Sequence, residues 1–434
     1  MGTPPTLRIE GSLRRALAAF DADRLRWLDA AAALGPLTGL RLGPATVWVL
    51  SDPEAARTML VTEADAWTRP PAMRVPIRLG VGENLFTQRD KAWRLLAPQL
   101  APSFRKRALD ERLAGLGELI EREVGTLPIG EEVDLELAMG RIALILAAWV
   151  LVGDHLDHDR ATEIAEHQRH VVAWVGRRLG RLSAAVPLAF GAPTRVMREH
   201  RRAIRAYADD VIRRAQRRDG RGPDVLAALV DARVHGKPLS ADELRGHVLG
   251  LLLAGNETTA AALSWALVHA SRNPAEWARL RSEPERARLF VDENLRMTPA
   301  VWGMARTPTR GGVTLAAGAH ELAVRRPEVV TVYLRAANLD PAVWPEPQRF
   351  DPDRHLTAGR EQQRSLIPFG LGPRGCIGQH LALAEMLAAL PVLARHGDVR
   401  IDQEVREDAS FALRVAGGLR GRFTRATGGS CAAP

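Results

Sequence analysis

The chain has 434 residues, of which 46% are hydrophobic, so it can bury a large core. Its formal net charge is +9, but the arginines alternate with acidic residues at helical spacing, as in residues 198–210. That pattern is typical of solvated helix faces and argues against a nucleic-acid partner. The longest apolar run, Ile142 to Val152, is shorter than the roughly 18–20 residues of a membrane span, and no secretory signal is visible. We therefore expect a cytoplasmic protein that does not contact a membrane.

Two short strands and a helix are expected near the start of the core. Leu40 to Leu42 and Val47 to Leu50 have strand-like composition, and Asp52-Pro53 is typical of a helix start. Most of the chain that follows carries helical patterns separated by glycine and proline.

A long apolar stretch from about Leu239 to Ser271 is predicted to be a single helix. Ser240 and Glu243 form a capping box at its start. Some thirty residues at 1.5 Å each span roughly 45–50 Å, so this helix crosses the core. Its middle, residues 254–259, reads Ala-Gly-Asn-Glu-Thr-Thr. An acid and two hydroxyls are costly inside an apolar helix, which indicates a local distortion or a buried polar task, unless the notch faces solvent.

The next helix carries an acid and a base one turn apart. Ser282 and Glu285 predict a capping box at its start, and Glu293 and Arg296 lie within it. A proline-rich stretch that ends in Arg354 follows. Short strands are expected at residues 313–315, 320–324 and 329–332, and a terminal hairpin around Gly417-Gly418 in residues 410–423.

Residues 369–378 read Phe-Gly-Leu-Gly-Pro-Arg-Gly-Cys-Ile-Gly and lead into an apolar helix from about Leu381 to Leu390. A helix N-terminus and Arg374 both lower the pKa of a nearby thiol, so the sequence predicts a thiolate at Cys376. The glycines leave the backbone bare, as a broad flat ligand requires. A thiolate against such a ligand suits haem iron. A structural cysteine in a turn and a nucleophilic cysteine are the alternatives.

This segment matches the signature Phe-Gly-x-Gly-x-(His/Arg)-x-Cys-x-Gly, so the chain resembles the cytochrome P-450 family from about Leu40 onward. The resemblance implies a mainly α fold with a small β region, in which a long central helix lies distal to haem b and the cysteine loop lies proximal. No linker divides the sequence, so we expect one domain over residues 1–434. Its parts are an extension with a first helix (about 1–39), a core (40–423) and a tail (424–434).

The resemblance also implies the residues that hold the cofactor. Cys376 would be the iron ligand. The family often carries a Trp or His four residues before an arginine that reaches a haem propionate, but Ala97 stands four residues after Trp93. Arg94 is then the nearest candidate for a haem propionate, with a surface arginine as the alternative. The other implied cofactor residues are Arg306, Phe369, Gly370, Arg374 and Gly378.

Five further residues receive roles from the same resemblance. Glu257 and Thr258 would be the acid–alcohol pair that manages proton delivery during oxygen activation. Glu293, Arg296 and Arg354 would form a buried structural triad behind the haem. Removing one member of a buried charge set costs about 3–5 kcal/mol.

The substrate pocket would be lined mainly by apolar side chains, which predicts a lipophilic ligand. By family position its wall would also include residues 416–418. The pocket residues expected are Val75, Ile77, Leu85, Phe86, Leu251, Ala254, Val301, Trp302 and Met304.

We therefore expect a monomeric haem-thiolate monooxygenase of soluble bacterial type that acts in secondary metabolism. About 58 residues follow Cys376, so electrons would come from a separate ferredoxin or flavodoxin with its NAD(P)H reductase. Basic residues 105–107 would attract an acidic donor, or are ordinary helix-end charges. A peroxide-driven or oxidative-coupling enzyme and a non-enzymatic haem-binding sensor are the alternatives, and an intact Glu257-Thr258 pair disfavours the former. With Cys376 on iron, Cys431 would be a free thiol.

Overall fold

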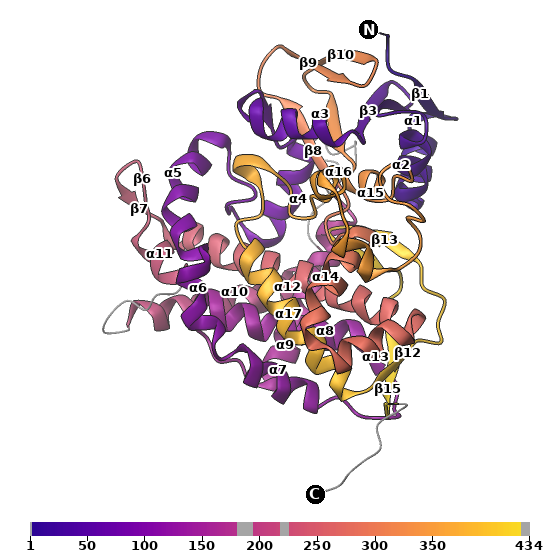
Figure 1. Ribbon diagram of the computed structural model, residues 1–434. Coiled ribbons are helices and arrows are strands. Elements are labelled where there is room, and N and C mark those ends of the chain that lie inside the picture. Colours follow the sequence, from indigo (N-terminus) through magenta and orange to yellow (C-terminus); the bar gives the residue numbers. More distant parts are fainter. Residues whose placement is uncertain (1, 180–193, 218–224, 427–434) are drawn as a thin grey trace, which may run out of the picture.

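The computed structural model describes residues 2–179, 194–217 and 225–426. Helices form the body of the molecule, and the largest sheet lies at one end of it (Figure 1). The expected class, mainly α with a small β region, is confirmed. Cys431 and most of the expected tail lie outside the described residues.

The largest sheet joins strands from distant parts of the chain. Val47 of β3 lies opposite Val329 of β11 in a parallel pair. The strands expected at 40–50 and 313–332 are confirmed, and Asp52 caps the short helix α3 (Pro53–Arg57). The sheet order is β1 (Thr6–Ile9), β2 (Leu37–Leu42), β3 (Ala45–Leu50), β11 (Val329–Val332), β8 (Met304–Pro308) and β4 (Trp67–Thr68), with β9 (Gly312–Ala317) and β10 (His320–Arg325) as a separate hairpin.

The hairpin expected in residues 410–423 is wrong. The hairpin lies earlier, between β13 (Glu407–Ala409) and β14 (Leu413–Val415). Gly417 and Gly418 both have positive φ, and they direct the chain away from β14 into β15 (Arg420–Thr424). β15 pairs with β12 (Asp398–Arg400) and β5 (Val133–Asp134), because a bare Gly421 lets it lie against Arg400, whose carbonyl oxygen would be 2.7 Å from an added Cβ.

The helical body surrounds two central helices, α12 and α17, which contact each other. Smaller elements near the largest sheet are α1 (Leu13–Ala22), α2 (Arg24–Ala32), α15 (Leu334–Asn338) and α16 (Arg360–Ser365). The body consists of α4 (Pro71–Val81), α5 (Asp90–Leu100), α6 (Lys106–Leu113), α7 (Leu116–Gly125), α8 (Leu135–Ala147), α9 (His158–Gly176), α10 (Arg195–Gln216), α11 (Val225–Asp231), α12 (Ala241–Arg272), α13 (Pro274–Ser282), α14 (Ala287–Met297) and α17 (Gln379–His396), with the ribbon β6 (Arg233–Val234) and β7 (Lys237–Pro238) beside α5.

Helix α12 confirms the expected capping box and runs for 32 residues. It is continuous through residues 254–259, so of the alternatives for this segment the local distortion is not what the structure has. The Thr258 hydroxyl donates a 2.7 Å hydrogen bond to the Ala254 carbonyl, which satisfies it without a break in the helix. The capping box expected at Ser282 is wrong, because Ser282 ends α13 and donates its hydroxyl back to the Arg279 carbonyl. Helix α14 begins only at Ala287.

Two helical stretches in the described part of the chain are long and apolar enough to be candidate membrane spans. They are Leu135–Val152, which contains the apolar run expected at 142–152, and α12. Within their apolar windows 78% and 83% of the residues are buried in the protein. Helices α8 and α12 pack against each other, so the core accounts for their composition.

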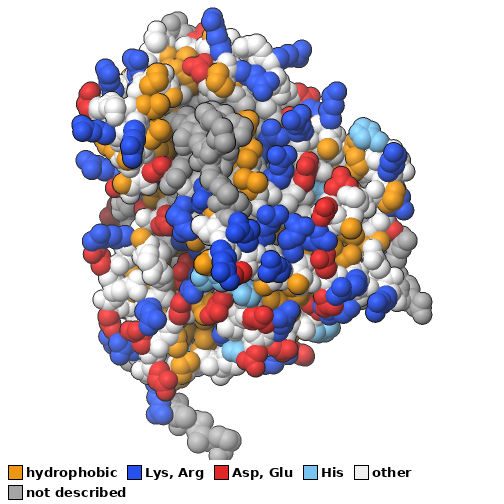
Figure 2. Space-filling model, turned by 180° about the vertical axis from the view of Figure 1, so that it is seen from behind, with side chains coloured by type: hydrophobic (Ala, Val, Ile, Leu, Met, Phe, Trp, Pro, Cys, Tyr) orange, Lys and Arg blue, Asp and Glu red, His pale blue; other side chains and the backbone are white. Residues whose placement is uncertain are grey.

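Charged side chains are mixed over the surface. Figure 2 shows lysines and arginines interspersed with acidic residues on the face opposite to that of Figure 1. Many of them form exposed pairs one helical turn apart, such as Arg195 with Glu199 and Arg213 with Asp210. This agrees with the expectation of solvated helix faces.

Candidate active site

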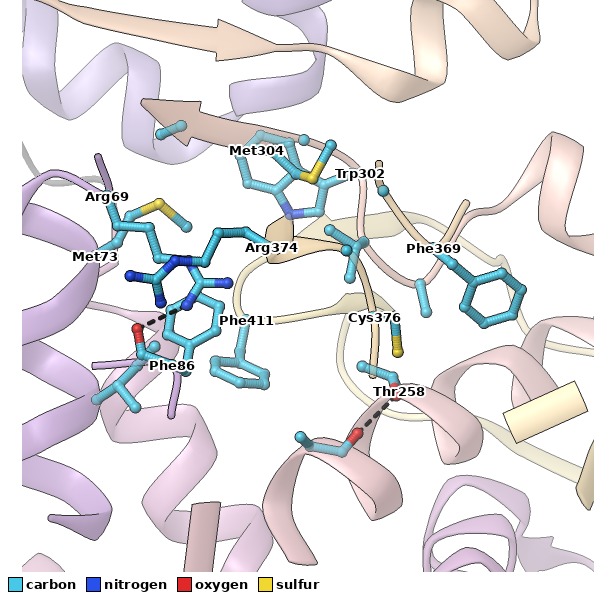
Figure 3. A pocket seen from close by; sticks show the side chains of 18 of the residues that line it. Arg69, Met73, Phe86, Thr258, Trp302, Met304, Phe369, Arg374, Cys376 and Phe411 are labelled. Carbon is cyan, nitrogen blue, oxygen red and sulfur yellow. Dashed lines mark hydrogen bonds between the residues drawn. The ribbon is translucent and has the colours of Figure 1, made fainter. Parts of the chain in front are cut away.

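A cavity of about 680 Å³ lies between α4, the middle of α12, strand β8 and the loop before α17. Cys376 enters it from that loop, and Thr258 enters it from α12 (Figure 3). Trp302, Met304 and Phe369 contribute to its largely apolar wall. The two sequence motifs, one on α12 and one in the loop before α17, therefore face the same cavity.

The cysteine loop is held by its own backbone. The Cys376 N–H donates to the Phe369 carbonyl at 2.8 Å, and Gly370 and Gly372 have φ values of 69° and 70°. A Cβ on Gly372 would lie 1.9 Å from the Leu60 carbonyl oxygen, so this glycine is required by packing rather than by a ligand. A Cβ on Gly378 would meet nothing within 4 Å. Of these three, only Gly378 leaves space free of protein atoms.

Burial raises the pKa of the Cys376 thiol, and a hydrogen bond from the Gly378 backbone opposes this rise only in part. Arg374, whose charge was expected to favour the thiolate, pairs instead with Asp90 at 2.6 Å and lies 3.9 Å from the centroid of the Trp93 ring. A bound metal cation deprotonates a coordinating thiol, so haem iron would favour the thiolate form of Cys376.

Three arginines gather at one end of the cavity. Arg69, Arg306 and Arg374 line it, whereas none of the described lining residues is acidic. Burial, and then the charge of Arg374, lower the pKa of Arg306 to about 10. Burial, Arg306 and Arg374 likewise hold the pKa of Arg69 well below its ordinary range. Asp90 pairs with Arg374 but does not itself line the cavity. This end of the cavity therefore has an excess of buried positive charge.

The expected position of Arg94 is wrong, and Arg69 was missed. Arg94 does not line the cavity: its side chain is 54% exposed and lies 2.6 Å from Asp65. Successive helix residues point about 100° apart, so Trp93 faces the cavity while Arg94 faces solvent. No motif marks Arg69 in the sequence. Its Nη1 donates to the Phe86 carbonyl at 2.9 Å, which aims the guanidinium along the cavity wall (Figure 3).

The predicted acid and alcohol on α12 face different spaces. Thr258 lines the main cavity, whereas Glu257 is buried on the other side of the helix. There it accepts a 2.9 Å hydrogen bond from Arg414, whose Nε lies 3.6 Å from Glu136. Burial raises the pKa of Glu136, Arg414 opposes this rise and Glu257 adds to it. Two carboxylates thus share one arginine behind α12.

A further buried carboxyl adjoins the cavity and was missed in the sequence. Thr259 lines the cavity and donates its hydroxyl to Glu385 of α17 at 3.0 Å. Burial raises the pKa of Glu385 to about 8, although the hydrogen bond from Thr259 opposes the rise. In the sequence, Glu385 was marked only as an acidic residue within the apolar helix predicted from about Leu381 to Leu390.

Glu293, Arg296 and Arg354 are brought together away from the cavity. Arg296 donates to both carboxylate oxygens of Glu293 at 2.8 and 2.9 Å, and Arg354 donates to one of them at 3.0 Å. His355, which was not foreseen, lies 2.9 Å from the other oxygen, and the Asp351 N–H also donates to Glu293. Both side chains of the Glu293–Arg296 pair are fully buried.

All but one of the apolar residues expected in the pocket line the cavity. Val75 does not, because residues 71–81 form helix α4 and its cavity face presents Met73 and Ile77, one turn apart. The wall expected at residues 416–418 is made instead by Ser410 and Phe411, at the tip of the β13–β14 hairpin. The expected residues that do line it are Ile77, Leu85, Phe86, Leu251, Ala254, Val301, Trp302 and Met304.

This arrangement fits haem b. Cys376 can supply a sulfur ligand, the apolar walls suit a flat macrocycle, and the arginines supply the positive charge that two propionates require. Arg69 and Arg306 carry buried charge without an acidic neighbour in the lining, which is a costly arrangement unless an anionic ligand is bound.

Known proteins with a similar sequence share one family. The family model described as Cytochrome P450 matches residues 25–416. Cyclooctatin synthase from Streptomyces melanosporofaciens is 28% identical over 85% of this chain and 84% of its own length. Cyclooctat-9-en-7-ol 5-monooxygenase from the same organism is 26% identical over 87% of this chain and 85% of its own length.

The fold also has a solved counterpart. The retinoic acid-bound cyanobacterial CYP120A1 superimposes with a TM-score of 0.78, covering 97% of this chain and 99% of that one. The two sequences are 22% identical, so the likeness concerns the fold.

Proposed function

Because this chain belongs to the cytochrome P450 family, we propose that it inserts one oxygen atom from O2 into a lipophilic small molecule, at the cavity between Cys376 and Thr258. As a member it is a haem-thiolate monooxygenase that binds haem b, O2, a substrate and redox partner proteins. The observation that carries the assignment of residues is the meeting of the loop cysteine and the α12 threonine in one largely apolar cavity.

The chain's own residues would hold the cofactor as follows. Cys376 would bind the iron through its sulfur, and haem bound there would supply the chemistry of oxygen activation. Arg69, Arg306 and Arg374 would hold the propionates. Phe369 packs beside the cysteine loop, and Gly378 leaves room for the macrocycle.

Residues on both sides of α12 would take part in supplying protons. Thr258 positions a proton on the cavity side, and its hydroxyl must leave the Ala254 carbonyl before it can donate elsewhere. Glu257 serves as the acid behind the helix, where Arg414 holds it in place and Glu136 lies beside the same arginine. Movement of Arg414 would let a proton pass from this pair toward the cavity.

The test is the coupling of electrons to product in Thr258→Ala. We expect product per NAD(P)H to fall and peroxide to rise, because positioned proton transfer contributes about 10²–10⁴-fold. The reduced carbon monoxide spectrum should keep its thiolate-type red-shifted Soret band, whereas Cys376→Ser should lose it. Unchanged coupling in Thr258→Ala, or wild-type turnover with peroxide and never with electron donors, would favour a peroxide-driven enzyme instead.

The proposed substrate class rests on the apolar cavity wall and on the name of one relative. The cavity wall is largely apolar, and the name of one relative gives its substrate as the unsaturated alcohol cyclooctat-9-en-7-ol. Both support a lipophilic compound of secondary metabolism as the substrate of this chain.

We further propose that the protein is a cytoplasmic monomer and receives electrons from a ferredoxin or flavodoxin. Arg105, Lys106 and Arg107 are exposed at the start of α6, which packs against α17 after the cysteine loop. A basic surface there attracts an acidic donor to the cysteine side of the molecule.

A further inference from the structure

We propose that a contact between histidines of α9 and α10 makes access to the cavity depend on pH, so that ligands enter faster in acid. This concerns entry to the cavity, whichever compound is oxidised there. The Nδ1 atoms of His167 on α9 and His200 on α10 lie 2.8 Å apart. The His170 ring stacks on that of His200, with centroids 4.0 Å apart and planes inclined by 13°. Three imidazoles thus meet where the two helices pack against each other.

This histidine contact tolerates only part of the protons that its rings can bind. Between His167 and His200 one Nδ1 must donate its hydrogen and the other must accept it, so at least one of the two rings is neutral. When both rings are protonated, each Nδ1 carries a hydrogen and the hydrogen bond is lost. In acid the stacked His170 adds a further positive charge beside His200. Because like charges repel, acid acts against the packing of α9 on α10.

The acidic residues near these rings are already paired and half exposed. His167 Nε2 lies 3.8 Å from one oxygen of Glu163, whose other oxygen accepts a 2.5 Å hydrogen bond from Arg160. Glu199, beside His200 in the sequence, pairs with Arg195 at 3.0 Å. The two glutamate side chains are 51% and 53% exposed, so water screens their charge. They reduce the repulsion among protonated rings but do not remove it.

The titration of His200 gives the pH range. Burial, and then the charges of His170 and His167, lower the pKa of His200 from its ordinary 6.5, and Glu199 and Glu166 oppose this only in part. When the helices separate, the ring regains its ordinary pKa. Because the pKa is lower while the contact is formed, the contact is complete above about pH 6.5 and is lost as the pH falls below that value.

Helix α9 is fixed on its other side, directly beside His167. The Gln168 amide oxygen accepts a 2.6 Å hydrogen bond from Asn256 of α12, and Gln168 is buried. This bond holds the middle of α9 on α12. Loss of the histidine contact therefore acts on the half of α9 that follows residue 168.

That half of α9 supports two walls of the cavity. A Cβ on Gly80 of α4 would lie 2.6 Å from Val175, so α4 packs directly on α9. A Cβ on Gly176 would lie 3.0 Å from that of Ser410, so the tip of the β13–β14 hairpin packs there too. Leu179, just beyond α9, lines the cavity itself. Movement of this half-helix separates α4 from the hairpin tip and widens the way into the cavity.

The test is the rate at which tert-butyl isocyanide binds the reduced, haem-loaded protein. This bulky probe binds haem iron and has no group that titrates in the range used, so a pH effect belongs to the protein. The association rate is measured by stopped-flow at the Soret band. Between about pH 7.5 and about pH 5.5 the rate should rise by about 2- to 10-fold, the range that one lost net hydrogen bond gives.

Two substitutions fix the contact in one state each. His200→Gln keeps a polar partner for His167 but cannot be protonated, so the rate should stay at its neutral value throughout. His200→Arg carries a permanent charge, so the rate should be high at both pH values. His235→Asn is the matched control: it removes an exposed histidine from the turn between β6 and β7, where φ is 52°, and should keep the wild-type pH dependence. Every protein must show the wild-type reduced carbon monoxide band at both pH values.

The outcomes are distinguishable. A wild-type rate that does not change with pH, or a pH dependence that survives in His200→Gln, overturns the role of the histidine contact while the proposed function stands. A slow rate for folded His200→Arg at neutral pH overturns it as well. Absence of the thiolate-type band in wild-type protein overturns the proposed function itself.

Discussion

Glu293 should stabilise the fold above about pH 5 and lose that effect in acid. Burial alone would raise its pKa, but hydrogen bonds from Arg296 and His355, the charge of Arg296 and the Asp351 N–H outweigh burial and lower the pKa to about 2. In the unfolded chain the group has its ordinary pKa of 4.5. Because the folded value is depressed, the stabilisation is present above pH 4.5 and is lost as pH falls toward 2.

Two routes give the size of the effect. A pKa depressed from 4.5 to about 2 corresponds to roughly 3 kcal/mol, of which about 2 kcal/mol is lost by pH 3. Independently, removing one member of a fully buried charge set costs about 3–5 kcal/mol. Glu293→Gln should therefore be about 3–5 kcal/mol less stable than wild type at neutral pH, and the gap should narrow in acid.

The assay is urea unfolding followed by tryptophan fluorescence from about pH 7 down to about pH 3. Trp344 reports on this cluster, since Arg296 lies 5.4 Å from its ring centroid. Glu54→Gln is the matched control, because its pair with Arg364 is exposed and should change stability by less than about 1 kcal/mol. A gap below 1 kcal/mol at neutral pH, or one that stays constant with pH, would refute the reasoning.

Three further substitutions test the site. Gly372→Ala should destabilise the protein by at least about 2 kcal/mol in thermal or urea unfolding, because of the φ of 70° and the contact with Leu60; wild-type stability would contradict this. Glu385 has its pKa raised to about 8 by burial, so its contribution to stability is lost as pH rises from 4.5 toward 8. Between about pH 5.5 and 7.5 the free energy of unfolding of wild type should then fall by about 2 kcal/mol relative to that of Glu385→Gln, as measured by urea unfolding. An equal pH dependence of the two proteins would argue against the raised pKa of Glu385. Arg69→Gln should speed haem transfer to an acceptor protein by roughly 10- to 100-fold, whereas Arg94→Gln should not; the reverse order would restore the sequence-based assignment.

The parts of the site that could be predicted are those written in consecutive residues. The loop before α17 carries its glycines and Cys376 within ten positions. Helix α12 is marked in the sequence by the capping box at Ser240 and by a long apolar stretch. Helix capping and glycine-rich loops depend on neighbouring residues alone, so both α12 and the cysteine loop could be predicted from the sequence. Arg69 is a single residue without a motif, and its place in the cavity wall depends on a tertiary contact, the hydrogen bond from its guanidinium to the Phe86 carbonyl.

The errors have similar causes. Val75 was assigned to the wall by family position, but in helix α4 it lies two residues, about 200° around the axis, from both Met73 and Ile77, which line the cavity. The Gly417-Gly418 pair is a good hairpin signal, but β15 has better partners in β12 and β5. The charge of Arg374 was expected to act on Cys376, yet Asp90, distant in sequence, binds it first.

The pairing of β3 with β11 has a consequence for synthesis of the protein. Val47 and Val329 are about 280 residues apart, and at 5–20 residues per second the ribosome needs about 15–60 s to make the intervening chain. During this time the apolar edge of β3 has no partner and is open to wrong pairing. Cys376 emerges later still, so haem can be captured only when nearly all of the cavity wall has left the ribosome. A chaperone that shields residues 45–50 should therefore raise the yield of haem-loaded protein more than added haem does.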